Sequence, residues 1–318
     1  METIPVMCMN QTGTVETMKR INVYWPEAHF NSEKMAILSL AGHTILGFDS
    51  VRVPFDNMVE AEAIGAKLLL GEWYEFPEVE PIKEKPSYYK FPSDPFECGR
   101  IHVVLRAVEK LKRLIESRTP IIVGITGPFS TFAYAFGLKR VLMWTLKEPE
   151  EIQLGLLKLT EFLKGYIDLL KHNADIICIE ENVTSPPMLS PSLFNRFVIH
   201  HLEELINTSK RPVVLHMCGN ILSILQHLQE LKIFGLSVDR KTDLDKIQKR
   251  KGIKIVGNID PYAILLNGNK SMIEEAVKKA IEAGVDILAP GCSLSPFTPN
   301  RNIQLLKKIA ITYLHRIS

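Results

Sequence analysis

Short apolar segments alternate with amphipathic helical segments along nearly the whole chain of 318 residues. Strands that are apolar on both faces and alternate with helices are typical of a parallel sheet covered by helices on both sides. The sequence predicts eight such strands, over residues 5–10, 50–55, 120–130, 175–182, 212–220, 234–240, 253–261 and 285–293.

Helical spacing of apolar residues follows most of these strands. Eight strand–helix units in a chain of this length predict a single α/β domain that spans residues 1–318. A (β/α)8 TIM barrel is favoured, and an open doubly wound sheet is the less favoured arrangement. No GxGxxG follows the first strand, so a dinucleotide-binding fold lacks its usual motif. Residues 71–100 are rich in proline and aromatic residues and are expected to form an irregular insertion. Helices are predicted over 31–46, 101–115, 150–172, 191–209, 221–231, 242–252, 271–284 and 298–318.

The charge pattern gives no reason to expect a nucleic acid partner. The 38 basic and 36 acidic residues nearly balance, and no long basic run is present. No apolar stretch reaches the roughly 18 residues that a membrane span needs, and the first ten residues do not read as a secretion signal. Five scattered cysteines do not form a disulfide framework, so we expect a cytoplasmic protein with reduced thiols and no membrane partner.

Two metal-binding residue types lie two positions apart in VVLHMCGN (213–220). His216 and Cys218 share one face of the predicted strand. Their place at the carboxyl end of the strand is the mouth of a barrel, where active sites of this fold lie. Cys292, in APGCSLSPF, follows the eighth predicted strand and would face the same mouth.

One imidazole and two thiolates are typical zinc ligands, and three protein ligands leave a position open for a substrate. The H-x-C pattern is short, however, and a buried cysteine is more often a small apolar side chain. Two thiolates would neutralise Zn²⁺ and make it a poor generator of hydroxide. Such a site suits a thiol substrate, so alkyl transfer to sulfur is favoured and hydrolysis comes second.

Segments throughout the chain resemble the methylcobamide:coenzyme M methyltransferases, which belong to the uroporphyrinogen decarboxylase superfamily. This resemblance implies a (β/α)8 barrel of the uroporphyrinogen decarboxylase type, with His216, Cys218 and Cys292 as zinc ligands. It also implies transfer of a methyl group from a methylated corrinoid protein to coenzyme M. The resemblance lies in MNQTGTVETMK (9–19), YWPEAHFNSEKMA (24–36), DSVRVPFDNMVEAEAIGA (49–66), TGPFS (126–130), LHMCGN (215–220), GNIDP (257–261) and APGCSLSPFTP (289–299).

Two alternatives stay open. A decarboxylase of this superfamily needs arginines near the first strand to hold a carboxylated porphyrin, and residues 10–18 contain none. The segment IEENVTSPP (179–187) departs from the Asp-Pro that many relatives carry, so the acceptor thiol could instead be homocysteine.

The H-x-x-G at His216 lacks the aspartate of a corrinoid-binding D-x-H-x-x-G motif, because Val214 stands in its place. The corrinoid is therefore expected on a partner protein.

Two further carboxylates follow predicted strands. Asp239 could be a fourth, displaceable zinc ligand, or it could be a helix-start acid paired with Arg240 or Lys241. Asp260 could accept a hydrogen bond from His216 and orient it, although an aspartate before a proline also forms turns.

Substrate contacts are expected from side chains at other strand ends. Asn10 and Gln11 could donate hydrogen bonds to the substrate, and Arg52 could pair with a sulfonate or carboxylate of the acceptor. Glu180, Glu181 and Asn182 could shape the acceptor pocket. For Asn10, Gln11 and Arg52, the sequence somewhat favours purely structural roles.

Overall fold

A parallel sheet of seven strands forms the centre of the computed structural model, which describes residues 4–115, 118–247 and 252–317. The strands follow the order β1-β4-β5-β6-β7-β8-β9, so each strand lies beside the next one along the chain. Seven of the eight predicted strands are confirmed. Their bounds are β1 Val51–Val53, β4 Ile121–Thr126, β5 Ile176–Glu181, β6 Val213–Met217, β7 Gly235–Val238, β8 Lys254–Ile259 and β9 Ile287–Pro290.

The predicted first strand, 5–10, is the exception. It forms a single parallel bridge, between Val6 and Leu288 of β9. Met7 N donates to Leu288 O at 3.0 Å, and Leu288 N donates to Pro5 O at 2.9 Å, while Asp49 N donates to Val6 O at 2.7 Å. The segment therefore contacts β9 on one side and Asp49, two residues before β1, on the other. Pro5 has no N–H to extend the ladder, and the described residues form a curled sheet of seven strands.

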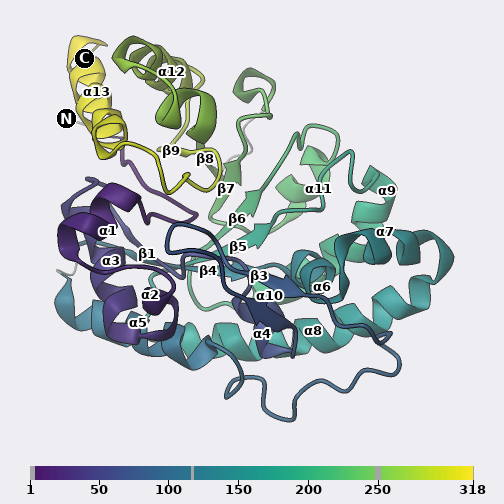
Figure 1. Cartoon of the computed structure of the whole chain (residues 1–318). Helices are drawn as coiled ribbons and strands as arrows, with labels where there is room; N and C mark the ends of the chain where they lie inside the picture. The colour runs from purple at the N-terminus through teal and green to yellow at the C-terminus, as the bar shows by residue number, and fades with distance from the viewer. Residues whose placement is uncertain (1–3, 116–117, 248–251, 318) are drawn as a thin grey trace.

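Helices surround the sheet, with α12 and α13 on one side of the molecule and α5 and α8 on the other (Figure 1). The predicted helices over 31–46, 101–115, 150–172, 271–284 and 298–318 are confirmed. The bounds are α1 Val15–Ile21, α2 Glu27–Phe30, α3 Ser32–Thr44, α4 Val59–Ala63, α5 Ile101–Leu114, α6 Pro128–Phe136, α7 Leu138–Lys147, α8 Pro149–Leu170, α9 Pro191–Phe194, α10 His200–Thr208, α11 Leu225–Glu230, α12 Lys270–Glu282 and α13 Asn300–Ile317, with π-helices η1 Asn195–Ile199 and η3 Pro261–Leu266 and the 3₁₀ turn η2 Leu244–Lys246.

Three helical predictions differ from the structure. The segment 191–209 is divided into α9, η1 and α10, and the helix predicted from 221 begins only at Leu225. Of the helix predicted over 242–252, the structure shows the 3₁₀ turn Leu244–Lys246, in which Asp243 caps Asp245 N; residues 248–251 lie outside the described residues. Within the predicted insertion, β3 (Glu78–Glu80) pairs antiparallel with β2 (Lys67–Leu69) in a small second sheet.

The register of the central strands positions polar side chains above an apolar interior. Met9, Ile122, Cys178, Val214, Val256 and Ala289 belong to one buried cluster. Closer to the carboxyl ends of the strands, Glu180 of β5 pairs in register with His216 of β6, and His216 with Ser237 of β7. Residues paired in register point to the same side of a sheet, so these three polar side chains lie next to one another. No helix among the described residues has the length and apolarity of a membrane span.

Glu60, in α4, is a buried carboxyl group whose two oxygens have no hydrogen-bond partner among the described residues. Burial raises its pKa from 4.5 to about 8. The folded protein therefore binds a proton that the unfolded chain releases, and this contribution is fully present below pH 4.5 and lost as the pH rises to about 8.

We expect Glu60→Gln to remove this pH dependence, because the amide keeps the shape of the carboxylic acid and never ionises. Between pH 5 and 8, the wild-type free energy of unfolding should fall relative to that of Glu60→Gln, by at most about 1.4 kcal/mol per pH unit. Urea unfolding of both proteins at several pH values measures the difference. A difference that stays constant across this range contradicts a protonated Glu60.

Candidate metal centre

His216 lies buried in β6, two residues before the loop that carries Cys218. Its Nδ1 atom forms a hydrogen bond of 3.0 Å with Ser237 Oγ on the neighbouring strand β7. This bond fixes the plane of the imidazole and leaves Nε2 as the ligand atom, which is the usual arrangement of a metal-binding histidine. Nε2 lies 3.5 Å from Cys218 Sγ.

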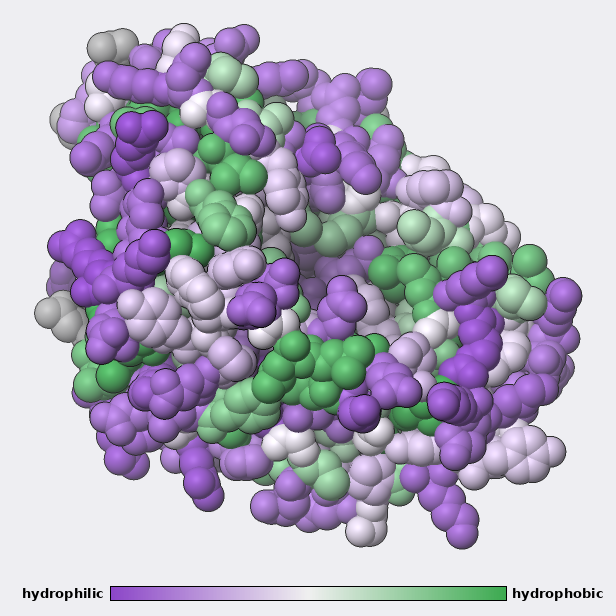
Figure 2. Space-filling view, in the orientation of Figure 1, coloured by the Kyte–Doolittle hydropathy of each residue, from purple (hydrophilic) through white to green (hydrophobic). Residues whose placement is uncertain are grey.

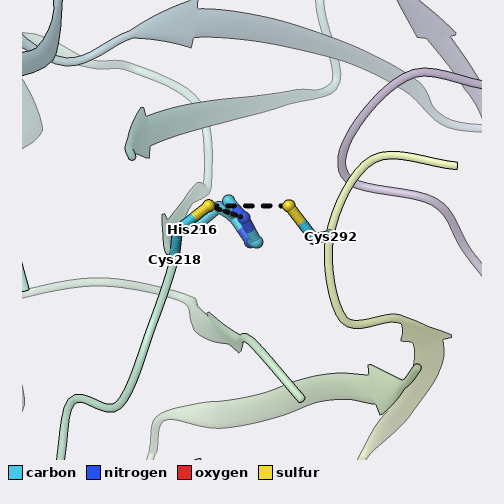
Figure 3. A group of neighbouring side chains, drawn as sticks. All are labelled: His216, Cys218 and Cys292. Atoms are coloured by element: carbon cyan, nitrogen blue, oxygen red, sulfur yellow. Dashed lines mark hydrogen bonds between the residues drawn. The ribbon is translucent and has the colours of Figure 1, made fainter. Parts of the chain in front are cut away.

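The two cysteines come from loops at the ends of β6 and β9 and approach each other across the sheet (Figure 3). Cys218 Sγ lies 3.5 Å from Cys292 Sγ. The loop after Cys218 turns at Gly219, whose φ of 87° favours glycine. Ser185 Oγ donates a hydrogen bond to the Cys218 carbonyl and so attaches this loop to the one after β5.

The three donor atoms fit one metal ion. The ligand atoms of His216, Cys218 and Cys292 all lie within 4.8 Å of one another. A tetrahedral zinc ion with bonds of about 2.3 Å to sulfur and about 2.0 Å to nitrogen has ligand–ligand edges of roughly 3.5–3.8 Å. The two distances of 3.5 Å agree with such edges, and an imidazole with two thiolates is a set that Zn²⁺ prefers.

The same proximity changes the acidity of the thiols. Hydrogen bonds from Cys218 and then His216 outweigh burial and lower the pKa of Cys292 to about 5. The bond with Cys292, together with burial, raises the pKa of Cys218 well above its usual value. Burial opposes the charged form of His216, but its contact with Cys292 raises its pKa overall. These shifts favour the thiolate form at Cys292 and the thiol form at Cys218.

Solvent can reach the centre. His216 is fully buried, whereas Cys218 and Cys292 are only partly buried. The space-filling view shows a hollow near the middle of the molecule, over the region where the central strands converge in the same orientation (Figure 2). A small molecule could thus approach the two sulfur atoms without unfolding the chain.

Asp239 and Asp260 occupy different places relative to the centre. Asp239 is buried after β7, and its charge raises the pKa values of both His216 and Cys218. Its Oδ1 accepts from Lys241 N at 2.8 Å, and its role as a displaceable ligand stays a prediction. The orienting role predicted for Asp260 is not what the structure shows. Asp260 caps η3 and pairs with Arg240 at 3.1 Å, and Ser237 is the partner of His216.

Arg52 makes its hydrogen bonds inside the protein. Its side chain is buried, and its three nitrogens donate to Met9 O, Pro54 O and Glu180 Oε1. Each nitrogen of the guanidinium thus has a partner inside the protein, and the pairing of Arg52 with a sulfonate or carboxylate of the acceptor stays a prediction. Asn10 donates to the same Glu180 at 3.0 Å, and its own oxygen is buried without a partner among the described residues.

Gln11 and Glu181 also serve internal contacts. Gln11 donates to Leu294 O and accepts from Gly13 N, so both ends of its amide are used. Glu181 accepts hydrogen bonds at the first turn of α6 from Phe129 N, Ser130 N and Ser130 Oγ at 3.0, 3.1 and 2.6 Å. Burial raises its pKa to about 7. These contacts give both side chains a structural role, and substrate binding by Gln11 and a pocket-shaping role for Glu181 stay predictions.

The family model for uroporphyrinogen decarboxylase (URO-D) matches residues 1–313 of this chain. The chain belongs to the uroporphyrinogen decarboxylase family. Within that family it belongs with the methylcobamide:coenzyme M methyltransferases. One such enzyme of Methanosarcina acetivorans is 33% identical over 318 residues, which cover 98% of this chain and 93% of the relative.

A solved structure of the family has the same fold. The methyltransferase from Methanosarcina mazei superposes with a TM-score of 0.93 at 32% identity, covering 99% of this chain and 95% of that one. A uroporphyrinogen decarboxylase of Orientia tsutsugamushi is also similar, at 22% identity over 97% of this chain and 94% of its own. The greater identity lies with the methyltransferases.

The sequence did not reveal that three further residues lie around the metal centre. Ser237 forms a hydrogen bond with His216 and orients it. The sequence signal for Ser237 was its place two residues before Asp239, on the same strand face. Asn182 accepts a hydrogen bond from Cys218 Sγ at 3.4 Å. Tyr134 of α6 is mostly buried beside Asn182. Their contacts depend on how separate strands and helices meet, which the sequence pattern did not reveal.

Proposed function

We propose that this chain is a zinc-dependent methyltransferase that moves a methyl group from a methylated corrinoid protein to the thiol of coenzyme M. The observation that carries the proposal is the donor set of His216, Cys218 and Cys292, with two sulfurs and one nitrogen at distances suited to one Zn²⁺. The relatives named methylcobamide:CoM methyltransferases support the choice of substrates.

The chemistry of the three donors favours a thiol over water as the fourth ligand. Bound Zn²⁺ would stabilise the deprotonated form of a substrate thiol at neutral pH. The chain contributes two soft thiolates, a buried imidazole held by Ser237, and a partly exposed position at the two cysteines. These residues bind and orient the acceptor sulfur, and they hold it where a large methyl donor can approach.

The reaction balances without a further redox partner. The acceptor thiol loses its proton to solvent, its sulfur forms a bond with the methyl carbon, and the carbon–cobalt bond of the donor breaks. The cobalt of the donor keeps the electron pair of that bond. The corrinoid comes on a partner protein in this proposal, because the chain lacks a D-x-H-x-x-G motif around His216.

The decarboxylase alternative has less support. A substrate with many carboxylates needs free cationic side chains around the mouth, and Arg52 is already paired with Glu180 inside the protein. The described residues also include the candidate metal-binding group at His216, and decarboxylation does not need such a group.

We further propose that residues 5–7 close the curled sheet of a single-domain barrel, a view supported by their bonds to both Leu288 and Asp49.

An assay with free methylcobalamin tests the function. We expect the zinc-loaded protein to demethylate methylcobalamin when coenzyme M is present, with much slower reaction when homocysteine replaces it. Loss of the methylcobalamin spectrum and formation of the methylated thiol are measured together. Protein that binds zinc but transfers methyl to neither thiol, or that releases CO₂ from uroporphyrinogen, would overturn the proposal.

Removal of zinc is expected to abolish methyl transfer and leave the fold intact. The ligands lie at the ends of strands that the sheet already fixes, and the large core does not need a metal, unlike that of a zinc finger. Thermal melting after chelation should show one cooperative transition, and activity should return when zinc is restored. Loss of the transition in the apo-protein would show that the metal holds the fold together.

A further inference from the structure

Asn182 is the polar side chain that contacts Cys218 from the loop after β5. Its Oδ1 atom lies 3.4 Å from Cys218 Sγ, with the thiol as the donor. The amino group of the same amide lacks such a contact. Asn182 Nδ2 is buried and has no hydrogen-bond partner among the described residues.

Tyr134 is a neighbour of this amide. It belongs to α6, it is mostly buried, and burial raises the pKa of its hydroxyl while the neighbouring Asn182 amide opposes that rise. The amide thus has two polar neighbours, a tyrosine hydroxyl and a cysteine sulfur. A hydroxyl can donate or accept, whereas an amide must present its oxygen to one neighbour and its amino group to the other.

Metal binding decides which way the amide points. A cysteine that ligates a metal is a thiolate and has no proton to donate. Asn182 Oδ1 would then face a negative sulfur, while a buried N–H stays unpaired, and each of these arrangements costs free energy. Rotation of the amide by half a turn presents Nδ2 to the sulfur and Oδ1 to the Tyr134 hydroxyl, so both groups gain a partner. The two orientations have nearly the same shape.

We propose that Asn182, held in place by Tyr134, is a positioning residue that donates an N–H···S hydrogen bond to Cys218 in the metal-loaded protein. This inference rests on the proposed metal centre. The bond withdraws charge from the Cys218 sulfur, and it thereby tunes how much charge remains for the substrate sulfur at the open position. It also orients Cys218, which lies on a loop and lacks the support that Ser237 gives to His216.

Cobalt substitution gives a readout that does not depend on activity. In Co²⁺-loaded protein the sulfur-to-cobalt charge-transfer bands report the charge on the thiolates. Loss of an N–H donor raises the energy of the sulfur electrons, so Asn182→Ala should shift these bands to longer wavelength. Asn182→Asp should shift them in the same direction, because a carboxylate has the same shape and cannot donate. Tyr134→Phe should give a smaller shift, since the amide is then free to rotate.

Zinc affinity provides a second measurement. Residues that support a metal ligand typically change affinity by roughly 10–100-fold when removed, and we expect Asn182→Ala to weaken zinc binding within that range in a competition assay with a chromogenic chelator. Asn220→Ala is the matched control. Asn220 follows Cys218 on the same loop, is exposed, and caps Leu222 N, so its loss should change neither the bands nor the affinity.

The outcomes separate this inference from the proposed function. Wild-type protein that binds neither Co²⁺ nor Zn²⁺ overturns the metal centre, and the inference falls with it. Metal-loaded protein whose bands and affinity are the same in wild type and Asn182→Ala overturns the inference alone. If Asn182→Ala does not fold by circular dichroism, Asn182→Asp decides on the same criteria, and an equal response of Asn220→Ala also counts against the proposal.

Discussion

Cys292→Ala is expected to reduce methyl transfer to the level of the reaction without enzyme. Cys292 supplies one of three donor atoms and is the only one of the three that comes from the end of β9. Two remaining ligands from β6 and its loop cannot hold zinc in a closed geometry. The zinc content of the purified variant and its rate of methylcobalamin demethylation measure the effect.

Cys98→Ala is the control for this substitution. Cys98 is a free, partly buried cysteine outside the group of three, so its replacement should leave zinc content and activity unchanged. The Cys292→Ala protein should remain soluble and helical by circular dichroism. Full activity in Cys292→Ala, with normal zinc content, would refute the assignment of this thiol as a ligand.

Arg52→Ala is expected to lower the free energy of unfolding by about 3–5 kcal/mol, the usual cost of leaving one partner of a buried ion pair alone. Arg52 and Glu180 are both buried, and the guanidinium also satisfies the carbonyls of Met9 and Pro54. Its loss leaves a buried carboxylate without its counter-charge and removes the donors that it supplies to two carbonyls. Urea unfolding followed by circular dichroism measures the change.

A second substitution tests the cause of this loss. Adding Glu180→Gln to Arg52→Ala removes the uncompensated charge, so the double variant should recover part of the lost stability. Lys67→Ala breaks an exposed pair with Glu80 and is expected to cost no more than about 1 kcal/mol. Similar small losses for Arg52→Ala and Lys67→Ala would show that the buried pair does not stabilise the fold.

Most strands of this fold could be predicted because a buried parallel strand needs apolar residues on both faces. β4, β5 and β6 are buried throughout, and each follows a loop or helix that is easy to recognise. Residues 5–10 are apolar as well, but hydrogen bonding to a partner decides whether such a segment is a strand. The segment pairs regularly only at Val6, which no local pattern could indicate.

The grouping of His216, Cys218 and Cys292 could be predicted because its signal is mostly local. His216 and Cys218 share a strand face by spacing alone, and Cys292 follows a strand that the topology brings to the same mouth. The partners of Arg52 and His216 could not be predicted in this way. Glu180 lies two strands away from β1, and Ser237 lies opposite His216 only through the register of β6 and β7.

The separation of 3.5 Å between Cys218 Sγ and Cys292 Sγ makes the empty centre sensitive to air. Two free thiols this close need only a small movement to form a disulfide of about 2.05 Å, with their two electrons passing to an oxidant such as dioxygen. That bond would occupy two of the three ligands, and metal added afterwards could not bind. Protein prepared in air without metal would thus show no methyl transfer after zinc is added. Treatment with a thiol reductant before the addition of zinc would restore the activity.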